Sequence, residues 1–432
     1  MADLKIIAKS AKAASIKLAS LSSEVKNEAL ERIADAIESN VHLVVEANGK
    51  DLEASKKMLE TGELSEAVFN RLKLDTNKIR DMIQGIRDLV SLEDPINKKV
   101  WGKELAEGLN LYKITCPIGV IGVIFEARPD VVAQIASLAI KSSNAVLLKG
   151  GKEAQNTNVV LADIINRTLS EIKGFPSNVI NLMLTREDVA QMLEMDEYID
   201  LIIPRGSNSL VKYIQSNTKI PVLGHAAGIC HIYIDESADI NKVLPICIDA
   251  KCQYPSACNA VETVLINKTV LSSILPSLVE EFKKNSVVVK ADEVCRQFVS
   301  AVEETTDADW ATEYGEKIIA IKAVDDLQQA IEHINHFGSG HTDSILTEND
   351  ENAETFMSLV DSAGVYKNAS TRFSDGFRYG FGAEVGISTN KTHARGPVGL
   401  EGLTIYKYKL YGNGDIVTDF CNEKRKFTHK AI

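Results

Sequence analysis

The strongest constraint on the fold is a repeated alternation of short apolar runs with polar turns and helix-like stretches. The segment 158–172, for example, carries apolar side chains at helical spacing between two such runs. This alternation is typical of βαβ units, in which helices cover a parallel sheet. One series of apolar runs covers 118–125, 145–148, 179–182, 201–203 and 232–234, and a second covers 261–266, 287–289, 318–321, 344–346 and 365–366. We therefore predict an α/β fold with two doubly wound domains.

Chain length and two strand-like flanks define the expected domain limits. A chain of 432 residues exceeds a single hydrophobic core, so we expect two or three domains. The segments 109–115 and 404–411 alternate as strands do, and we expect them to pair as a small β arm that reaches a second subunit of a homo-oligomer. The expected limits are 1–230, with an arm strand near 103–116, then 231–390, and finally 391–432 as a return segment that completes the arm.

Charge, cysteine content and hydropathy exclude several classes of protein. The net charge of −12 argues against a nucleic-acid partner, because proteins that bind a phosphate backbone usually present a basic face. Seven cysteines without paired spacing fit a reducing compartment, so we expect a cytoplasmic location. Lysines interrupt the amphipathic segment 4–18, which predicts a helix of the mature fold and not a signal peptide. The longest apolar stretch, 117–125, is far shorter than the ~20 residues of a membrane span.

Cys258 is the first candidate for chemistry. It lies among small and polar neighbours, just ahead of the apolar run 261–266. A thiol in a loop at the boundary of an element is accessible to substrate and, as thiolate, is a nucleophile. A buried structural cysteine is the alternative reading of the residue taken alone.

Polar loops follow several of the expected strands. Lys149 and two glycines end one strand, and Gly206 with Ser207 follows another, so backbone N–H groups and a cation meet at carboxyl ends of strands, where open α/β sheets bind ligands. Plain turn chemistry would explain both loops equally well, and Ser207 is also a suitable helix cap. No Gly-x-Gly-x-x-Gly motif follows the first strand.

Arginines mark two further candidate positions. Arg128 follows the run 118–125 and suits a carboxylate or phosphate, although an ion pair with Glu126 or Asp130 is the alternative. The cluster 366–373, with Asn368, Ser370 and Arg372, forms a candidate pocket wall. The histidines at 333, 336 and 341 lack a cysteine or acidic partner at ligand spacing, so we predict no metal site there.

These residues together resemble the gamma-glutamyl phosphate reductases of the aldehyde dehydrogenase superfamily. The resemblance covers nearly the whole chain, and the segments 126–129 and 333–343 are specific to this family within the superfamily. It rests on the segments 121–131, 149–153, 203–209, 223–228, 254–260, 330–345 and 365–397.

The resemblance implies an activity and roles for individual residues. Cys258 would attack L-glutamyl 5-phosphate, phosphate would leave, and the thioester would accept hydride from NADPH to give L-glutamate 5-semialdehyde, the second step from glutamate to proline. The first domain would bind NADP and the second would be catalytic. Substrate would contact Arg128, Asn368, Ser370 and Arg372, and cofactor would contact Lys149, Gly206, Ser207 and Glu313. A glutamate 5-kinase is an expected partner for the labile acyl phosphate.

One departure from the superfamily pattern carries its own expectation. Hydrolytic aldehyde dehydrogenases hold a general-base glutamate in the segment that resembles 223–228, and Gly224 stands nearest to that place here. An activated water would destroy the thioester of a phosphate-dependent enzyme. A phosphate-independent aldehyde dehydrogenase and a non-catalytic oligomeric scaffold on the same fold are the rival hypotheses.

Overall fold

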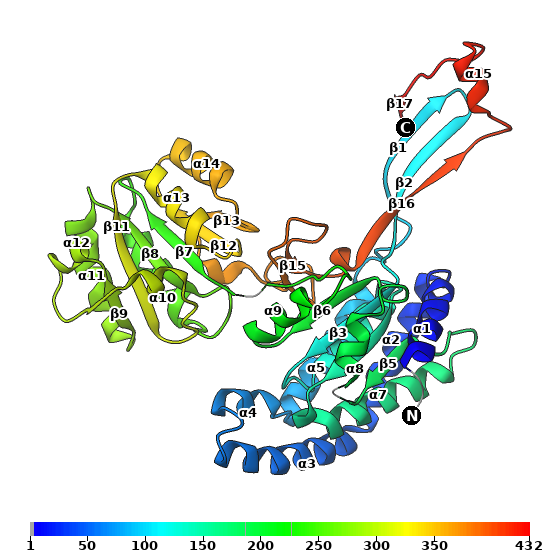
Figure 1. Ribbon diagram of the computed structural model, residues 1–432, viewed down its shortest axis with the longest axis horizontal. Coiled ribbons are helices and arrows are strands. Elements are labelled where there is room, and N and C mark those ends of the chain that lie inside the picture. The colour runs from blue at the N-terminus through cyan, green and yellow to red at the C-terminus, as the bar shows by residue number, and fades with distance from the viewer. Residues whose placement is uncertain (1–3, 186, 226) are drawn as a thin grey trace. The chain divides into compact units, whose positions relative to one another are not determined.

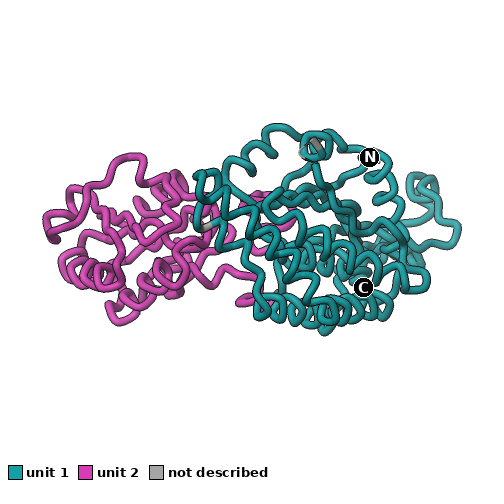
Figure 2. The backbone as a smooth tube through the Cα atoms, turned by 90° about the horizontal axis from the view of Figure 1, so that it is seen from below, with its two compact units in different colours: residues 1–223, 381–386, 398–432 teal, residues 224–380, 387–397 magenta. Residues whose placement is uncertain are grey.

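The computed structural model describes residues 4–185, 187–225 and 227–432 (Figure 1). The chain forms two compact units, unit 1 with residues 1–223, 381–386 and 398–432, and unit 2 with residues 224–380 and 387–397 (Figure 2). The change of unit at 223/224 precedes the limit of 230/231 that we expected, and 398–432 belongs to unit 1. Apolar periodicity locates a strand but does not say which sheet it joins.

Unit 1 contains a parallel four-stranded sheet with the order β5-β4-β3-β6. Its central strands are buried along their whole length, as expected for strands covered on both faces. Helices α1, α8 and α9 contribute to one apolar cluster with this sheet, and α6 and α7 contact β4 and β5. Since crossovers between parallel strands are right-handed, we expect α6 and α7 on the opposite face. The strands are β3 (Val120–Phe125), β4 (Ala145–Gly150), β5 (Ile180–Met183) and β6 (Leu201–Arg205).

The helices of unit 1 begin with the segment that we predicted as an amphipathic helix. They are α1 (Leu4–Leu18), α2 (Ser23–Ser39), α3 (Val41–Glu60), α4 (Glu66–Leu72), α5 (Thr76–Ser91), α6 (Val131–Lys141), α7 (Gln155–Ser170), α8 (Glu187–Leu193) and α9 (Asn208–Ser216).

Unit 2 contains a seven-stranded parallel sheet with the order β10-β9-β11-β8-β7-β12-β13. The run 232–234, which we grouped with the first series, belongs to β7 and pairs with β8 and β12 of this second sheet. The strands are β7 (Cys230–Ile234), β8 (Val261–Asn267), β9 (Val288–Ala291), β10 (Glu303–Glu304), β11 (Ile318–Val324), β12 (Thr342–Leu346) and β13 (Gly364–Lys367).

Helices cover both faces of the second sheet. Residues of α10 and α11 form one core cluster with it, and residues of α13 and α14 form another. The doubly wound architecture that we predicted is confirmed for this unit, because helices pack on both faces of its parallel sheet. The helices are α10 (Ile240–Cys252), α11 (Leu271–Lys284), α12 (Glu293–Arg296), α13 (Leu327–Phe337) and α14 (Asp350–Leu359).

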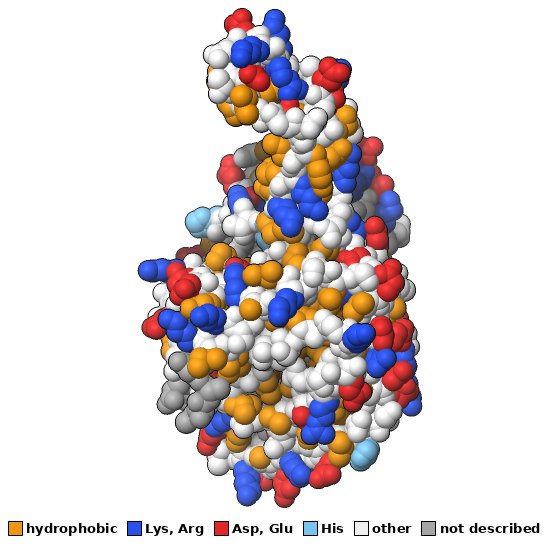
Figure 3. All heavy atoms as spheres, turned by 90° about the vertical axis from the view of Figure 1, so that its right-hand side faces the viewer, with side chains coloured by type: hydrophobic (Ala, Val, Ile, Leu, Met, Phe, Trp, Pro, Cys, Tyr) orange, Lys and Arg blue, Asp and Glu red, His pale blue; other side chains and the backbone are white. Residues whose placement is uncertain are grey.

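A four-stranded antiparallel sheet forms the arm of unit 1, with the order β16-β2-β1-β17. The predicted pairing is confirmed, because Thr404 to Tyr411 lie opposite Pro117 to Asn110 in register. Hydrophobic side chains lie among lysines on the visible face of the arm (Figure 3), and Tyr406, Tyr408 and Tyr411 are exposed. The remaining elements are β1 (Lys99–Ala106), β2 (Leu109–Pro117), β16 (Thr404–Tyr411), α15 (Val417–Cys421), β17 (Lys430–Ala431), β14 (Gly386–Ser388) and β15 (Gly396–Val398).

Candidate active site

Cys258 lies in the loop between α10 and β8, and its side chain is half-buried. Its Sγ lies 3.3 Å from Nε2 of His341, which is within hydrogen-bond distance for sulfur. Gly228 packs directly against Cys258, since a Cβ at position 228 would lie 2.6 Å from Cys258 Cα. Only glycine permits this approach. The segment 223–228 therefore forms one wall of the thiol site, although Ala226 lies outside the described residues.

Two histidines face the thiol. The rings of His225 and His341 meet edge to face, with centroids 5.4 Å apart. Nδ1 of His341 lies 2.9 Å from Oγ1 of Thr342, and Nδ1 of His225 lies 3.0 Å from the carbonyl oxygen of Ile387. With a proton on Nδ1, each ring would donate a hydrogen bond to its oxygen. Nε2 of each ring would then be the hydrogen-bond acceptor. Sequence reasoning considered His341 only together with His333 and His336, and it did not recognise His341 as the partner of Cys258.

The thiol and both histidines precede three strands of the same sheet. Cys258, His225 and His341 come before β8, β7 and β12, and these parallel strands are aligned, with Cys230 opposite Val261 and Ser344 opposite Ile232. The amino ends of parallel strands meet at one edge of a sheet. The register of the sheet therefore brings together residues that are far apart in the sequence. Cys258 and His341, for example, are 83 positions apart.

The segment 370–378 brings guanidinium groups to the thiol loop. Thr371 Oγ1 donates to the carbonyl oxygen of Asn259, and Asn259 Nδ2 donates to that of Ser374, so the loop and the segment are bonded to each other. Arg372 is buried, and its Nε donates to Oε1 of Gln253 at 2.9 Å.

Burial and neighbouring charges shift the pKa of Arg372. Burial lowers the pKa of the Arg372 guanidinium, Arg378 lowers it further, and the negative charge of a Cys258 thiolate raises it. Nη1 of Arg378 donates to the carbonyl oxygen of Arg372 at 2.8 Å. Arg378 is thus a second cation here, and sequence reasoning did not select it.

Asn368 and Ser370, which we predicted to contact substrate, have structural roles in the described contacts. The Asn368 amide accepts from the N–H of Thr347 and donates to its carbonyl oxygen, at the carboxyl end of β12. Thr347, to which Asn368 is hydrogen-bonded, is six residues after His341, which corresponds to about 20 Å along a strand. Ser370 Oγ accepts from the N–H of Arg372. The structure brings Arg372 to the thiol and leaves Asn368 at the opposite end of the strand.

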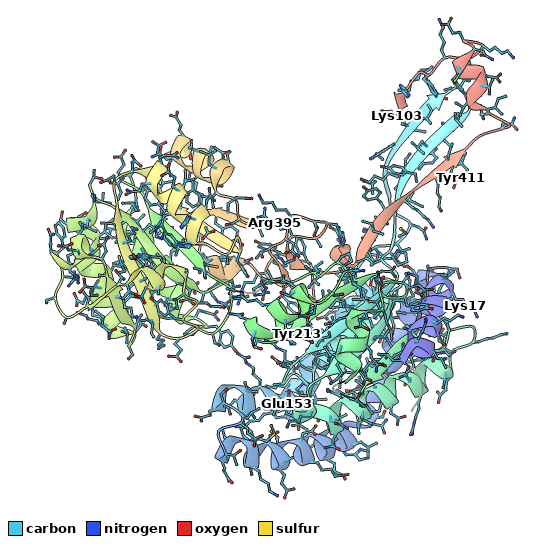
Figure 4. All side chains as sticks on the ribbon, viewed as in Figure 1. Lys17, Lys103, Glu153, Tyr213, Arg395 and Tyr411 are labelled. Carbon is cyan, nitrogen blue, oxygen red and sulfur yellow. The ribbon has the colours of Figure 1, made fainter. Side chains whose placement is uncertain are left out.

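Acidic side chains of unit 1 occupy backbone donors in the expected cofactor loops. The N–H of Ser207, at the start of α9, donates to Oε2 of Glu126 at 2.7 Å. A Cβ at Gly206 would lie 2.4 Å from the same oxygen, so this glycine leaves room for an anion. The N–H of Ala127 donates to Oε1 of Glu153 at 2.7 Å, and Figure 4 labels Glu153. These carboxylates stand in for the oxyanions that a dinucleotide would present, and the loops therefore fit such a cofactor.

The other cofactor and substrate candidates of unit 1 lie at the same edge. Lys149 is buried at the end of β4, with its Nζ donating to the carbonyl oxygen of Gly150. Arg128 is half-buried after β3, and within the described part of the chain no ion pair joins it to Glu126 or Asp130. Ser207 caps α9 by accepting from the N–H of Leu210, as the alternative reading of its sequence proposed.

Glu313 lies in unit 2, in the loop that precedes β11. A buried ion pair supports this loop, because Lys251 lies 2.6 Å from Glu262, and Glu262 accepts from the N–H of Gly315. Burial raises the pKa of Glu262 to about 7, although Lys251 opposes the shift. The loop that carries Glu313 is thus anchored to the strand that follows Cys258.

Comparison with known proteins identifies the family. The model of the aldehyde dehydrogenase family matches residues 1–317. A gamma-glutamyl phosphate reductase of Brachyspira hyodysenteriae is 60% identical over 426 residues, which are 99% of this chain and 99% of the relative. The crystal structure of gamma-glutamyl phosphate reductase from Thermotoga maritima has a TM-score of 0.92 at 40% identity, and the match covers 96% of this chain and 99% of that chain.

A more distant neighbour shares the fold. Glyceraldehyde-3-phosphate dehydrogenase from Methanocaldococcus jannaschii, solved in complex with NADP, has a TM-score of 0.65 at 14% identity over 95% of this chain and 94% of that chain. With the thiol site, the βαβ units and the full-length matches considered together, the chain belongs to the aldehyde dehydrogenase family and, within it, to the gamma-glutamyl phosphate reductases.

Proposed function

We propose that the chain reduces L-glutamyl 5-phosphate to L-glutamate 5-semialdehyde through a thioester on Cys258, with NADPH as the reductant. The observation that carries this proposal is the hydrogen bond between Cys258 Sγ and His341 Nε2, in a loop that the segment with Arg372 binds through Thr371 and Asn259. A thiol next to a histidine is the arrangement that activates a cysteine nucleophile.

His341 prepares the nucleophile. With its Nδ1 proton directed to Thr342 Oγ1, the ring offers the Nε2 lone pair to the thiol and takes up the proton of Cys258. The thiolate attacks the acyl carbon, a C–S bond forms, and the C–O bond to phosphate breaks with its electron pair on phosphate. The backbone N–H of Cys258 is the proposed donor to the oxyanion.

Arginine side chains neutralise the substrate. The phosphoryl group and the α-carboxylate of the substrate are anionic. Because the protein carries a net charge of −12, local cations are required to bind them. Arg372 and Arg378 of unit 2 are the proposed partners near the thiol, and Arg128 of unit 1 is proposed as a further contact. A guanidinium binds such groups with two parallel hydrogen bonds.

The cofactor contacts are proposed residue by residue from the family resemblance. In unit 1 these are Lys149, Gly206 and Ser207, and in unit 2 Glu313. The nicotinamide cofactor, when bound, supplies hydride to the thioester carbon, after which the C–S bond breaks and the Cys258 thiolate is restored. Lys152, three residues after Lys149, is exposed and provides a cation for a 2′-phosphate. This supports the proposal that the enzyme uses NADPH and not NADH.

Hydrolysis of the thioester is the second candidate, because His225 lies close enough to the thiol to activate a water. One ring nitrogen of His225 lies within 4.8 Å of Cys258 Sγ. An enzyme that used this base would oxidise the aldehyde to free glutamate without phosphate. The absence of a carboxylate at Gly224 favours the phosphate-dependent reaction.

One experiment separates these functions. Purified protein is mixed with NADP and glutamate 5-semialdehyde, with and without inorganic phosphate, and NADPH is followed by stopped flow. We expect a burst of about one NADPH per Cys258, followed by a slow phase that phosphate accelerates, because the thioester persists without an acceptor. Cys258→Ala should show no burst, whereas Cys421→Ala, at an exposed cysteine of unit 1, should behave as the parent.

The outcomes decide between the candidates. Rapid formation of glutamate without phosphate would establish hydrolysis and assign the base to His225. A burst that survives Cys258→Ala would contradict the nucleophile, and no NADPH under any condition would favour a non-catalytic scaffold.

Assembly and location are also proposals. The exposed tyrosines of the arm support a homo-oligomer, since a β edge rich in aromatic side chains favours contact with a second copy. Seven free thiols support a reducing, cytoplasmic location. Among the described residues, none of the helices has the length and apolar character that a membrane crossing requires. A glutamate 5-kinase is proposed as the donor of the acyl phosphate.

A further inference from the structure

Three soft or borderline metal ligands meet at the amino edge of the second sheet. Cys258 Sγ and one ring nitrogen each of His225 and His341 lie within 4.8 Å of one another. Ligand atoms of a tetrahedral zinc ion lie about 3.5 Å apart, given Zn–N and Zn–S distances of about 2.0–2.3 Å. Cys258 Sγ and His341 Nε2 lie 3.3 Å apart, and a ring nitrogen of His225 lies within 4.8 Å of both ligand atoms.

Contacts behind the rings orient both histidines as ligands. A metal-bound histidine almost always donates its other N–H to an oxygen, which fixes the ring and its tautomer. Nδ1 of His225 lies 3.0 Å from the carbonyl oxygen of Ile387, and Nδ1 of His341 lies 2.9 Å from Thr342 Oγ1. Both rings thus meet this condition with Nε2 available.

Burial and charge define which cation would fit. His341 is 1% exposed, whereas His225 and Cys258 are half-buried, so three protein ligands leave a fourth position accessible to water. The set contains no carboxylate, and thiolate with imidazole selects zinc-like ions over magnesium or calcium.

We propose that Cys258, His225 and His341 bind a thiophilic divalent cation, with Zn²⁺ as the prime candidate, and that the bound ion reversibly inhibits the enzyme. On binding, the S–H bond of Cys258 breaks, an S–Zn bond forms, and the proton is released to solvent. The sulfur lone pair is then committed to the metal and no longer attacks substrate. The inhibitory effect rests on the proposed function of Cys258, whereas binding of the ion does not.

Cobalt titration of the full chain, free of substrate, tests the binding. Co²⁺ replaces Zn²⁺ at such sites and reports a thiolate ligand by near-ultraviolet charge-transfer absorption and low coordination number by its visible bands. We expect one equivalent of Co²⁺, displacement by Zn²⁺, and loss of the thiolate band in Cys258→Ala. The affinity for Zn²⁺, measured by competition with a chelating dye, should fall about tenfold to a hundredfold or more in His225→Ala and His341→Ala.

Matched variants control for other ligands. His336→Ala removes an exposed histidine of α13, and Cys421→Ala removes an exposed cysteine of α15, and both should bind Co²⁺ as the parent does. His225→Gln and His341→Gln, with folding checked by circular dichroism, accompany the alanine variants so that loss of binding is not loss of fold.

The readings of the experiment separate the two proposals. A missing thiolate band, or Zn²⁺ affinity unchanged by both histidine variants, overturns the metal site whatever the activity shows. Binding at the cluster with full turnover of the Zn²⁺-saturated enzyme overturns the inhibition and the nucleophile role together. Binding, inhibition and recovery with a chelator, all dependent on the three side chains, establish the proposal.

Discussion

The two parallel sheets present their polar groups at opposite ends. In unit 1, Lys149 lies near the end of β4, and Gly206 and Arg128 follow β6 and β3, so all three lie at the carboxyl edge, where open α/β sheets usually bind ligands. In unit 2, His225, Cys258 and His341 precede strands and lie at the amino edge. The carboxyl-edge rule therefore finds the loops of the first sheet and misses the cluster of the second.

The two edges also differ in how complete they are. At the amino edge of unit 2, the thiol lies within hydrogen-bond distance of His341, the rings of His341 and His225 meet edge to face, and Arg372 donates to Gln253. At the carboxyl edge of unit 1, Glu126 and Glu153 occupy the N–H donors of Ser207 and Ala127. The thiol site is thus preorganised by the protein's own contacts, whereas carboxylates occupy backbone donors of the proposed cofactor loops.

The largest expected effect concerns the guanidinium pair of unit 2. Arg372→Lys and Arg378→Lys keep the charge and lose the fork that binds phosphate or carboxylate in two places. Each lost charge-assisted contact corresponds to about 1.5–3 kcal/mol, or about tenfold to a hundredfold in kcat/KM for the acyl phosphate. Steady-state kinetics with Arg167→Lys, on the surface of α7, as the control variant provide the measurement.

Unchanged kinetics in both variants would remove the pair from the substrate site. A fall in Arg372→Lys alone would identify Arg372 as the contact and Arg378 as its support, in agreement with the hydrogen bond from Arg378 to the Arg372 carbonyl.

Much of the fold was predictable from the sequence, because strands buried on both faces appear as continuous apolar runs. The run 261–266 matches β8, and the segments 109–115 and 404–411 pair as the arm. The run 232–234 was correctly recognised as a strand and assigned to the wrong series, since only hydrogen-bond pairing assigns a strand to its sheet.

The candidate site was less predictable, since its contacts are distant in sequence. The loop made Cys258 a candidate and the family resemblance predicted it as the nucleophile, but His341, which lies within hydrogen-bond distance of its Sγ, is 83 residues away. The available signal was positional: His341 comes just before β12 and Cys258 shortly before β8, and the parallel strands of one sheet start at the same edge. Asn368 has a side chain of the kind that binds substrates, but its amide is hydrogen-bonded to the backbone of Thr347.

The polar interior of unit 2 predicts a dependence of stability on pH. His333 packs edge-on against His231 and Trp310, and burial, with smaller contributions from His231, Lys322 and His336, lowers its pKa from 6.5 to about 3. Between these values the unfolded chain binds the proton and the folded chain does not. The free energy of unfolding therefore falls as the pH falls below 6.5.

The expected size of this loss is about 1.4 kcal/mol between pH 7.5 and pH 5.5. Urea unfolding followed by Trp310 fluorescence, in a Trp101→Phe background, measures unit 2, because the chain has only these two tryptophans. His333→Phe should reduce the loss, with the exposed residue in His336→Phe as the control. An equal loss in parent and His333→Phe would show that His333 is already protonated or exchanges protons in the folded state.

The smallest expected effect concerns the occupied donors of unit 1. Glu126→Gln retains the shape of the side chain but removes the charge that competes with an anion for the N–H of Ser207. A charge at a helix N-terminus contributes about 0.3–1 kcal/mol, so NADPH affinity should rise about two- to fivefold. Fluorescence titration of NADPH measures this directly, and Glu46→Gln, at an exposed position of α3, is the control. If Glu126 instead positions the loop for the cofactor, Glu126→Gln will bind NADPH more weakly, and the loop of unit 1 will prove to be as preorganised as the thiol site of unit 2.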